Sequence, residues 1–187
     1  MGNKVIELIK SRRSTRVFAE EQIKDLEIKQ IIEAGIYAPS AHNCQSWHFT
    51  VIQDKNIIVK LSQESKKVLK THPDEAFRKM AKNPNFNIFY NAPTIVLVSG
   101  DTKGMLPETN CAAATQNMLV AAESLNIGSC WVGLLAFAFN GENSDAVKTE
   151  LKIPEDYKPY YAISLGYKKV PNGKAPKRKE NCVDYIK

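Results

Sequence analysis

The sequence RRSTR at residues 12–16, together with APSAHNCQSW at residues 38–47, carries most of what this chain reveals about its fold and its ligand. The first segment places three guanidinium groups around Ser14, and guanidinium donors match phosphate oxygens in pairs. The second segment offers Ser40, Asn43 and Gln45, whose side chains can hydrogen-bond to the edge of a flat ring. The two segments together fit a phosphorylated, amide-rich ligand such as flavin mononucleotide (FMN).

Each segment also has an ordinary structural explanation. Three arginines can form a solvated basic turn, and Ser40 and Asn43 can bond to the local backbone as turn residues. The ligand interpretation therefore depends on the presence of both segments in one chain.

The spacing of apolar residues around these segments predicts alternating helices and strands. Helices are predicted for a short segment capped by Asn3, a segment from near Asp25 to before Pro39, residues 57–69, 74–81 and 110–125, and a short segment capped by Ser144. Gly128 is expected to cap the helix at 110–125. Strands are predicted at residues 47–52, 94–98, 130–132 and 160–165, and an edge strand at 183–186. This order predicts an α+β sheet domain.

Composition and length indicate one globular domain over residues 1–187. The hydrophobic share of 43% and the charged share of 25% are ordinary for a globular protein. No apolar run approaches the ~18 residues of a membrane span, and residues 1–10 lack the apolar centre of a signal peptide. We therefore expect a cytoplasmic protein without a membrane partner.

Charge and motif content narrow the possible functions. The formal net charge is +6, but the basic residues gather only at residues 12–16 and 168–179, so an anionic small ligand is favoured over nucleic acid. The four cysteines lack zinc-ligand spacing, and only three histidines are present. No metal site and no catalytic side chain are expected, and a cofactor is expected to supply the chemistry.

These residues resemble the nitroreductase family of flavin enzymes. The family pattern Arg-Arg-Ser-x-Arg-x-Phe stands here at residues 12–18, and Pro-Ser-x-x-Asn-x-Gln-Pro-Trp stands at residues 39–47. The similarity continues in order through Ala92-Pro93, IGSCWVG at residues 127–133 and LGY at residues 165–167. It thus spans nearly the whole chain.

The resemblance implies a central, mostly antiparallel sheet flanked by helices, in an intertwined homodimer with FMN in two sites at the interface. The tail, residues 168–187, would cross onto the partner subunit, and part of the loop at residues 39–45 would reach the partner's FMN. The implied cofactor-binding residues are Arg12, Arg13, Ser14, Arg16, Pro39, Ser40, Asn43, Gln45, Gly133, Leu134, Lys177 and Arg178.

The implied activity is that of an NAD(P)H-dependent oxidoreductase with a ping-pong cycle. NAD(P)H gives hydride to the flavin, and an electron-poor acceptor such as a nitroaromatic or a quinone then takes it. No acid or base side chain is needed. Arg16 is expected to tune the ring, because a cation beside it favours the reduced anionic state.

Three alternatives remain at this point: a flavin enzyme of different chemistry, such as a dehalogenase, a non-catalytic FMN-binding protein, and a basic nucleic-acid-binding module. The chain also departs from the family pattern. Ser46 replaces the frequent proline before Trp47, and Cys44 lies inside the loop, either near the flavin or as a packed thiol. Phe137 and Phe139 are expected either in the core or along a substrate pocket.

Overall fold

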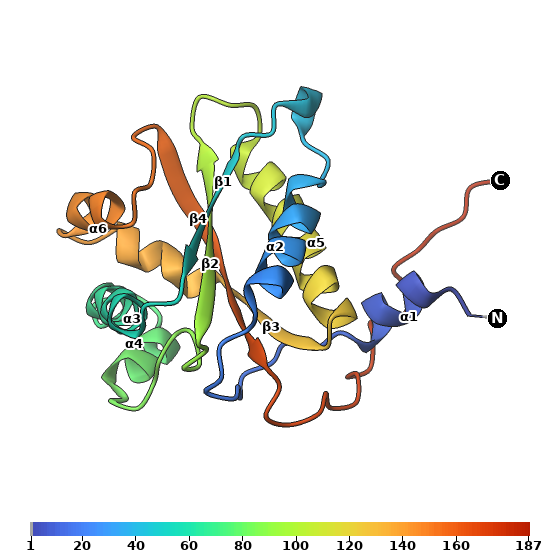
Figure 1. Ribbon diagram of the computed structural model, residues 1–187, viewed down its shortest axis with the longest axis horizontal. Helices are drawn as coiled ribbons and strands as arrows, with labels where there is room; N and C mark the ends of the chain where they lie inside the picture. Colours follow the sequence, from blue (N-terminus) through green and yellow to red (C-terminus); the bar gives the residue numbers. More distant parts are fainter. Residues whose placement is uncertain (1) are drawn as a thin grey trace.

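A four-stranded antiparallel sheet with the strand order β1-β2-β4-β3 forms the centre of the computed structural model, which describes residues 2–187. Helices α2 and α5 cover one face of the sheet, and α3, α4 and α6 lie on the other side (Figure 1). In chain order the elements are α1 Lys4–Ser11, α2 Asp25–Ile36, η1 Ala41–Asn43, β1 Trp47–Ile52, α3 Lys55–Leu69, α4 Glu75–Lys82, β2 Thr94–Asp101, α5 Pro107–Ser124, β3 Ile127–Val132, η2 Gly133–Phe139, α6 Ser144–Glu150 and β4 Tyr157–Tyr167.

Alternation along the strands divides the core into two layers. On β2, Ile95 and Leu97 pack toward α3 and η2, whereas Val96 and Val98 pack toward α2 and α5. All four side chains are fully buried, as expected for a central strand covered on both faces. The predicted α+β fold with an antiparallel sheet is confirmed.

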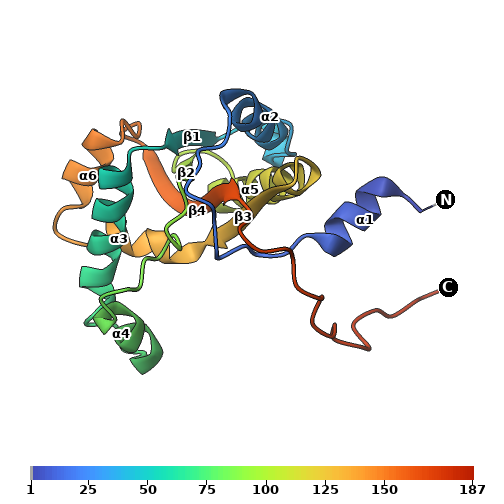
Figure 2. The ribbon, with the colours of Figure 1, turned by 60° about the horizontal axis from the view of Figure 1, so that its bottom comes forward.

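Helix α1 and the tail project together from one side of the body (Figure 2). Asn3 caps α1 as predicted, because its Oδ1 accepts from the backbone N–H of Val5 at 3.0 Å. No residue of α1 is buried, and the side chains of Val5, Ile6 and Ile9 are about half exposed, at 58, 49 and 52%. The apolar face of α1 therefore has no cover within the described chain.

The start of the tail is fixed by Glu123 at the end of α5. Its carboxylate lies 3.0 Å from Lys168 Nζ, and the two side chains are only 9 and 11% exposed. Asn172 Nδ2 donates to the same carboxylate at 2.9 Å and to the carbonyl of Ser11 at 3.3 Å. These contacts send the tail past α1 and away from the sheet.

Four local predictions need correction. Gly128 lies inside β3, and the left-handed residue after α5 is Asn126, with φ of 58°. The strand predicted at 130–132 extends over Ile127–Val132. Ser144 begins α6 but donates to the carbonyl of Phe139 instead of capping the helix. Residues 183–186 form no strand, because no strand edge of the described chain lies beside them.

None of the helices within residues 2–187 has the length and apolarity that crossing a membrane requires.

Candidate functional site

The arginine segment, residues 12–16, runs along the outer edge of β3. Ser14 pairs with Ser129 in parallel, and the Thr15 N–H donates to the Ser129 carbonyl at 2.9 Å. A Cβ on Gly128 would lie 2.7 Å from Thr15 Cγ2, so this close approach requires glycine in β3. The segment is thereby held in a defined register on the sheet.

Arg12, Ser14 and Arg16, three of the predicted site residues, all affect the pKa of Cys130 in β3. Burial raises the pKa of the Cys130 thiol, and Arg16, Ser14 and Arg12 oppose that rise. The Arg16 guanidinium also lies over the ring of Tyr90, with Cζ 5.5 Å from the ring centroid. Hydrogen bonding to Tyr90 raises the pKa of Arg16, and burial opposes this rise. Arg12, Ser14 and Arg16 therefore form a positively charged cluster beside one strand.

Arg13 is directed toward the end of α1. Its Nη1 donates to the carbonyl of Lys10 at 2.8 Å and to that of Arg12 at 2.6 Å. Its Nε is buried and has no hydrogen-bond partner among residues 2–187. Arg13 thus closes α1, and its buried Nε is an unused donor within the arginine segment.

The residue directly after β3, Gly133, has empty space where a side chain would be. Gly133 begins η2 directly after β3, and a Cβ built on it would meet nothing within 4 Å. Cys130 precedes Gly133 by three residues, which is about 10 Å along a strand. Leu134 is half-buried and packs against the core on the α3 side. The cationic cluster and the open position therefore lie along one edge of the sheet.

The loop with Pro39, Ser40, Asn43 and Gln45 contains η1 and lies at the other end of the sheet (Figure 1). It leads into β1, where Trp47 pairs with Gly100 of β2. Ser129, beside the arginine segment, pairs with Leu165, which pairs with Thr94 of the same strand β2. Thr94 and Gly100 are separated by about 20 Å of strand, so one chain does not bring the two segments together.

The loop has a defined internal structure. Ser40 Oγ accepts from the Gln45 N–H at 3.0 Å, and Gln45 Nε2 donates to Asn43 Oδ1 at 3.3 Å. The side chains of Asn43 and Gln45 are exposed. Asn110 of α5 bonds to this loop, and neither Asn110 nor Tyr90 was identified from the sequence, because no local motif marks them.

The remaining predicted residues occupy separate surroundings. Lys177 forms an exposed ion pair with Glu180 within the tail, at 2.9 Å, and Arg178 is exposed beside it. Phe137 packs edge-on against His72, with ring centroids 5.4 Å apart, whereas Phe139 packs against the core. Within residues 2–187, no cluster of histidine, cysteine and carboxylate side chains could hold a metal ion.

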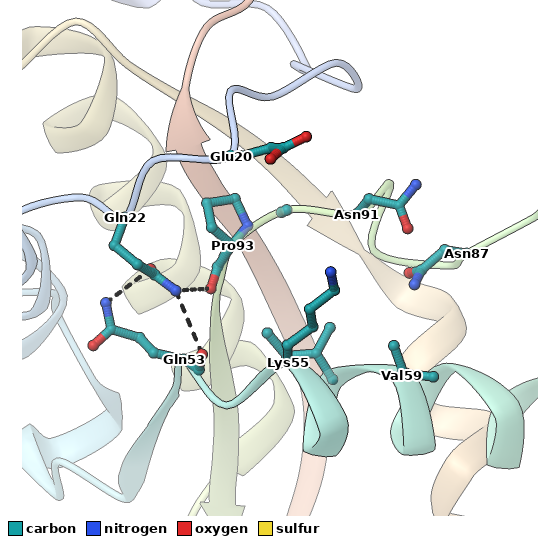
Figure 3. Close-up of a pocket in the computed structure, with 10 residues that line it drawn as sticks. Glu20, Gln22, Gln53, Lys55, Val59, Asn87, Asn91 and Pro93 are labelled. Atoms are coloured by element: carbon teal, nitrogen blue, oxygen red, sulfur yellow. Dashed lines mark hydrogen bonds between the residues drawn. The ribbon is translucent and has the colours of Figure 1, made fainter.

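A separate cavity of about 470 Å³ lies between the start of α3 and the turn before β2 (Figure 3). Its rim is closed by amides: Gln22 Nε2 donates to the Pro93 carbonyl at 2.8 Å, and Gln53 Nε2 donates to Gln22 Oε1 at 3.0 Å. Lys55, Glu20 and Asn91 also line it. The arginine segment does not line this cavity, so the cavity is separate from the candidate site.

The cysteines provide a first testable prediction. Thiolates are the reactive form, and burial raises the pKa of Cys111 to about 12 and also raises that of Cys130. Cys44 is exposed. Iodoacetamide near neutral pH is expected to label Cys44 in the folded protein and to label Cys111 and Cys130 only after unfolding in guanidinium. Peptide mass spectrometry measures this order, and equal labelling of Cys130 and Cys44 in the folded protein contradicts it.

Known proteins resemble this chain in sequence over most of its length. The model described as "Nitroreductase family" matches residues 9–167. A relative from Archaeoglobus fulgidus, provisionally named as an NADH dehydrogenase/NAD(P)H nitroreductase, is 36% identical over 169 residues, covering 88% of this chain and 85% of its own.

Two solved structures share the fold from end to end. A nitroreductase with bound FMN from Bacteroides fragilis is 33% identical, with a TM-score of 0.92 and full coverage of both chains. A nitroreductase with bound FMN from Desulfitobacterium hafniense is 26% identical, with a TM-score of 0.90 and full coverage of both chains. The matched regions include β3, the arginine segment and the loop before β1.

Proposed function

Because this chain belongs to the nitroreductase family, we propose that it transfers hydride from NAD(P)H through FMN to an electron-poor acceptor in a ping-pong cycle. The chain is an NAD(P)H-dependent flavin oxidoreductase with FMN as its cofactor. The proposed acceptors are nitroaromatics, quinones and compounds of similar electron demand.

One observation carries the proposal: the arginine segment lies beside β3, and Gly133, directly after β3, has free space where a side chain would be. Ser14 pairs with Ser129 of β3, Arg12 and Arg16 lie on either side of Ser14 in the chain, and a Cβ at Gly133 would meet nothing within 4 Å. The unused Nε of Arg13 adds a donor for an anion. These residues fit FMN, with the cations and Ser14 holding the phosphate, ribityl chain and pyrimidine edge, and with Gly133 and Leu134 along the flat ring.

A second copy of the chain completes the proposed site. Pro39, Ser40, Asn43 and Gln45 lie too far along the sheet to reach the arginine segment of their own chain. We propose that they reach the FMN of a partner in a homodimer.

Uncovered apolar side chains support this arrangement. Beside the loop, Tyr37 is 79% exposed and Leu106 is 59% exposed, and the face of α1 is uncovered as well. We further propose that the tail, residues 168–187, crosses onto the partner and brings Lys177 and Arg178 to the phosphate.

When bound, FMN supplies the acceptance and donation of hydride. The chain's own residues bind and orient it. Arg16, which lies over the ring of Tyr90, would supply a permanent positive charge near the flavin, where negative charge develops on reduction. Arg12 and Ser14 provide charge-assisted hydrogen bonds to the phosphate end. No side chain of this set needs to gain or lose a proton during the cycle.

The absorbance spectrum of the purified, FMN-loaded protein tests the proposal, followed by anaerobic addition of NADH and then NADPH. We expect flavin bands that bleach within seconds, and parallel reciprocal plots when donor and acceptor are varied, as in a ping-pong cycle. Bands that persist with both donors indicate a binding protein without turnover. No retained flavin after reconstitution overturns the assignment.

A further inference from the structure

One buried side chain, Asn110 in α5, holds the loop that carries Ser40, Asn43 and Gln45. Asn110 is 3% exposed. Its Oδ1 accepts from the Ala41 N–H at 3.0 Å, and its Nδ2 donates to Ser46 Oγ at 2.9 Å and to the Met105 carbonyl at 2.8 Å. Both ends of one amide thus bind the two sides of the loop.

The loop backbone needs such support. His42, Asn43 and Gln45 have positive φ angles of 50, 54 and 46°, a region that asparagine and histidine adopt more readily than Gln45 does. The bonds of Ser40 and Asn43 to Gln45 are internal to the loop and do not fix it to the body. Asn110 connects the loop to α5, a long helix that packs on the sheet.

Asn110 is also where the loop and the connection from β2 to α5 meet. The Met105 carbonyl belongs to that connection, and Cys44 Sγ lies 3.3 Å from the Asn110 Nδ2 atom. Moving the amide would free the Ala41 N–H and the Ser46 hydroxyl together, although the Ser46 carbonyl would still accept from the Asp101 N–H at 2.8 Å. Ala41 and Ser46 flank Asn43 and Gln45 in the chain. The positions of the exposed Asn43 and Gln45 side chains therefore depend on Asn110, which is itself buried.

We propose that Asn110 is a positioning residue for the flavin site: it sets the conformation in which Asn43 and Gln45 meet the FMN of the partner. This inference rests on the proposed function, because it requires that the loop approaches a bound flavin. Asn110 itself touches no cofactor and acts through the loop.

The same helix provides a matched control. Asn117 also lies in α5, and its Nδ2 donates to the Ala34 carbonyl of α2 at 3.1 Å. It makes an interhelical hydrogen bond of the same chemistry without contacting the loop. A general loss of packing around α5 should affect Asn110→Ala and Asn117→Ala alike, whereas a positioning role affects only the first.

The experiment is FMN titration of the purified protein, followed by flavin fluorescence, for the wild type and both variants, with thermal unfolding of the same samples. Asn110→Ala is expected to raise the Kd for FMN at least ~10-fold, a change worth about 1.4 kcal/mol. Asn117→Ala is expected to change it less than ~3-fold. Should Asn110→Ala fail to fold, Asn110→Ser retains a donor and is expected to show a smaller rise in Kd.

A double-mutant cycle with Asn43→Ala separates positioning from general destabilisation. If Asn110 acts through the loop, Asn43→Ala should cost much less FMN affinity in the Asn110→Ala background than in the wild type. Additive losses, or equal Kd values for the two α5 variants, overturn the inference while wild-type flavin binding still stands. A wild-type protein that binds no FMN instead overturns the proposed function.

Discussion

Replacing Gly133 with valine is expected to remove most FMN affinity while leaving the chain folded. A Cβ added at this position meets no atom of the chain within 4 Å, and the backbone of Gly133 is not in the left-handed region. The proposed flavin ring lies in that space. Forcing a branched side chain against a packed ligand costs about 1–3 kcal/mol, which is roughly one to two orders of magnitude in Kd.

The measurement is FMN titration beside thermal unfolding of the flavin-free protein. Gly128→Ala is the contrasting variant, because its added Cβ would lie 2.7 Å from Thr15 Cγ2 and must destabilise the chain itself. We expect Gly133→Val to keep the unfolding temperature of the wild type and Gly128→Ala to lower it. Wild-type FMN affinity in Gly133→Val would show that the ring does not lie against η2.

Arg16→Ala is expected to weaken FMN binding and to slow flavin reduction by NAD(P)H. A charge-assisted hydrogen bond contributes about 1.5–3 kcal/mol, so Kd should rise roughly 10- to 100-fold. Loss of the cation should also lower the reduction potential of the bound flavin, because the reduced, anionic state loses its nearby positive charge. Arg16→Lys retains a charge and should recover part of both properties.

Arg78 of α4 provides the control for general effects of removing an arginine. Its Nη1 donates to the carbonyl of His72 at 2.7 Å, on the side of the molecule that carries α3 and α4. Arg78→Ala should leave the Kd for FMN and the rate of flavin reduction close to the wild-type values. Stopped-flow absorbance measures the rates, and unchanged rates and affinity in Arg16→Ala would remove Arg16 from the proposed site.

Short-range signals predicted the fold well. The run of β-branched and apolar residues at 94–98 predicted a strand, and β2, Thr94–Asp101, contains it. Asn3 caps α1 as expected because an N-cap bond involves neighbours in the chain. Gly128 shows the limit of such signals: its glycine is required by Thr15, a residue brought beside it only by folding.

Some residues of the candidate site follow from local sequence motifs, whereas others are brought to it only by folding. The arginine segment lies beside β3, where Ser14 pairs with Ser129, and the binding roles of Arg12, Ser14 and Arg16 remain predictions. Tyr90 and Asn110 could not be found from the sequence, because one stacks on a distant arginine and the other is buried beneath a distant loop. The roles of Lys177 and Arg178 depend on a second chain and remain predictions, whereas the strand predicted at 183–186 does not form.

The arginine segment and the loop before β1 lie at opposite ends of β2, and this separation has a genetic consequence. In the proposed homodimer each chain contributes to two pockets, with its arginines in one and its loop in the other. Two inactive alleles, one damaged at Arg16 and one at Asn43, would then complement each other. In the mixed pair both lesions fall in the same pocket, and the other pocket is built entirely from intact segments.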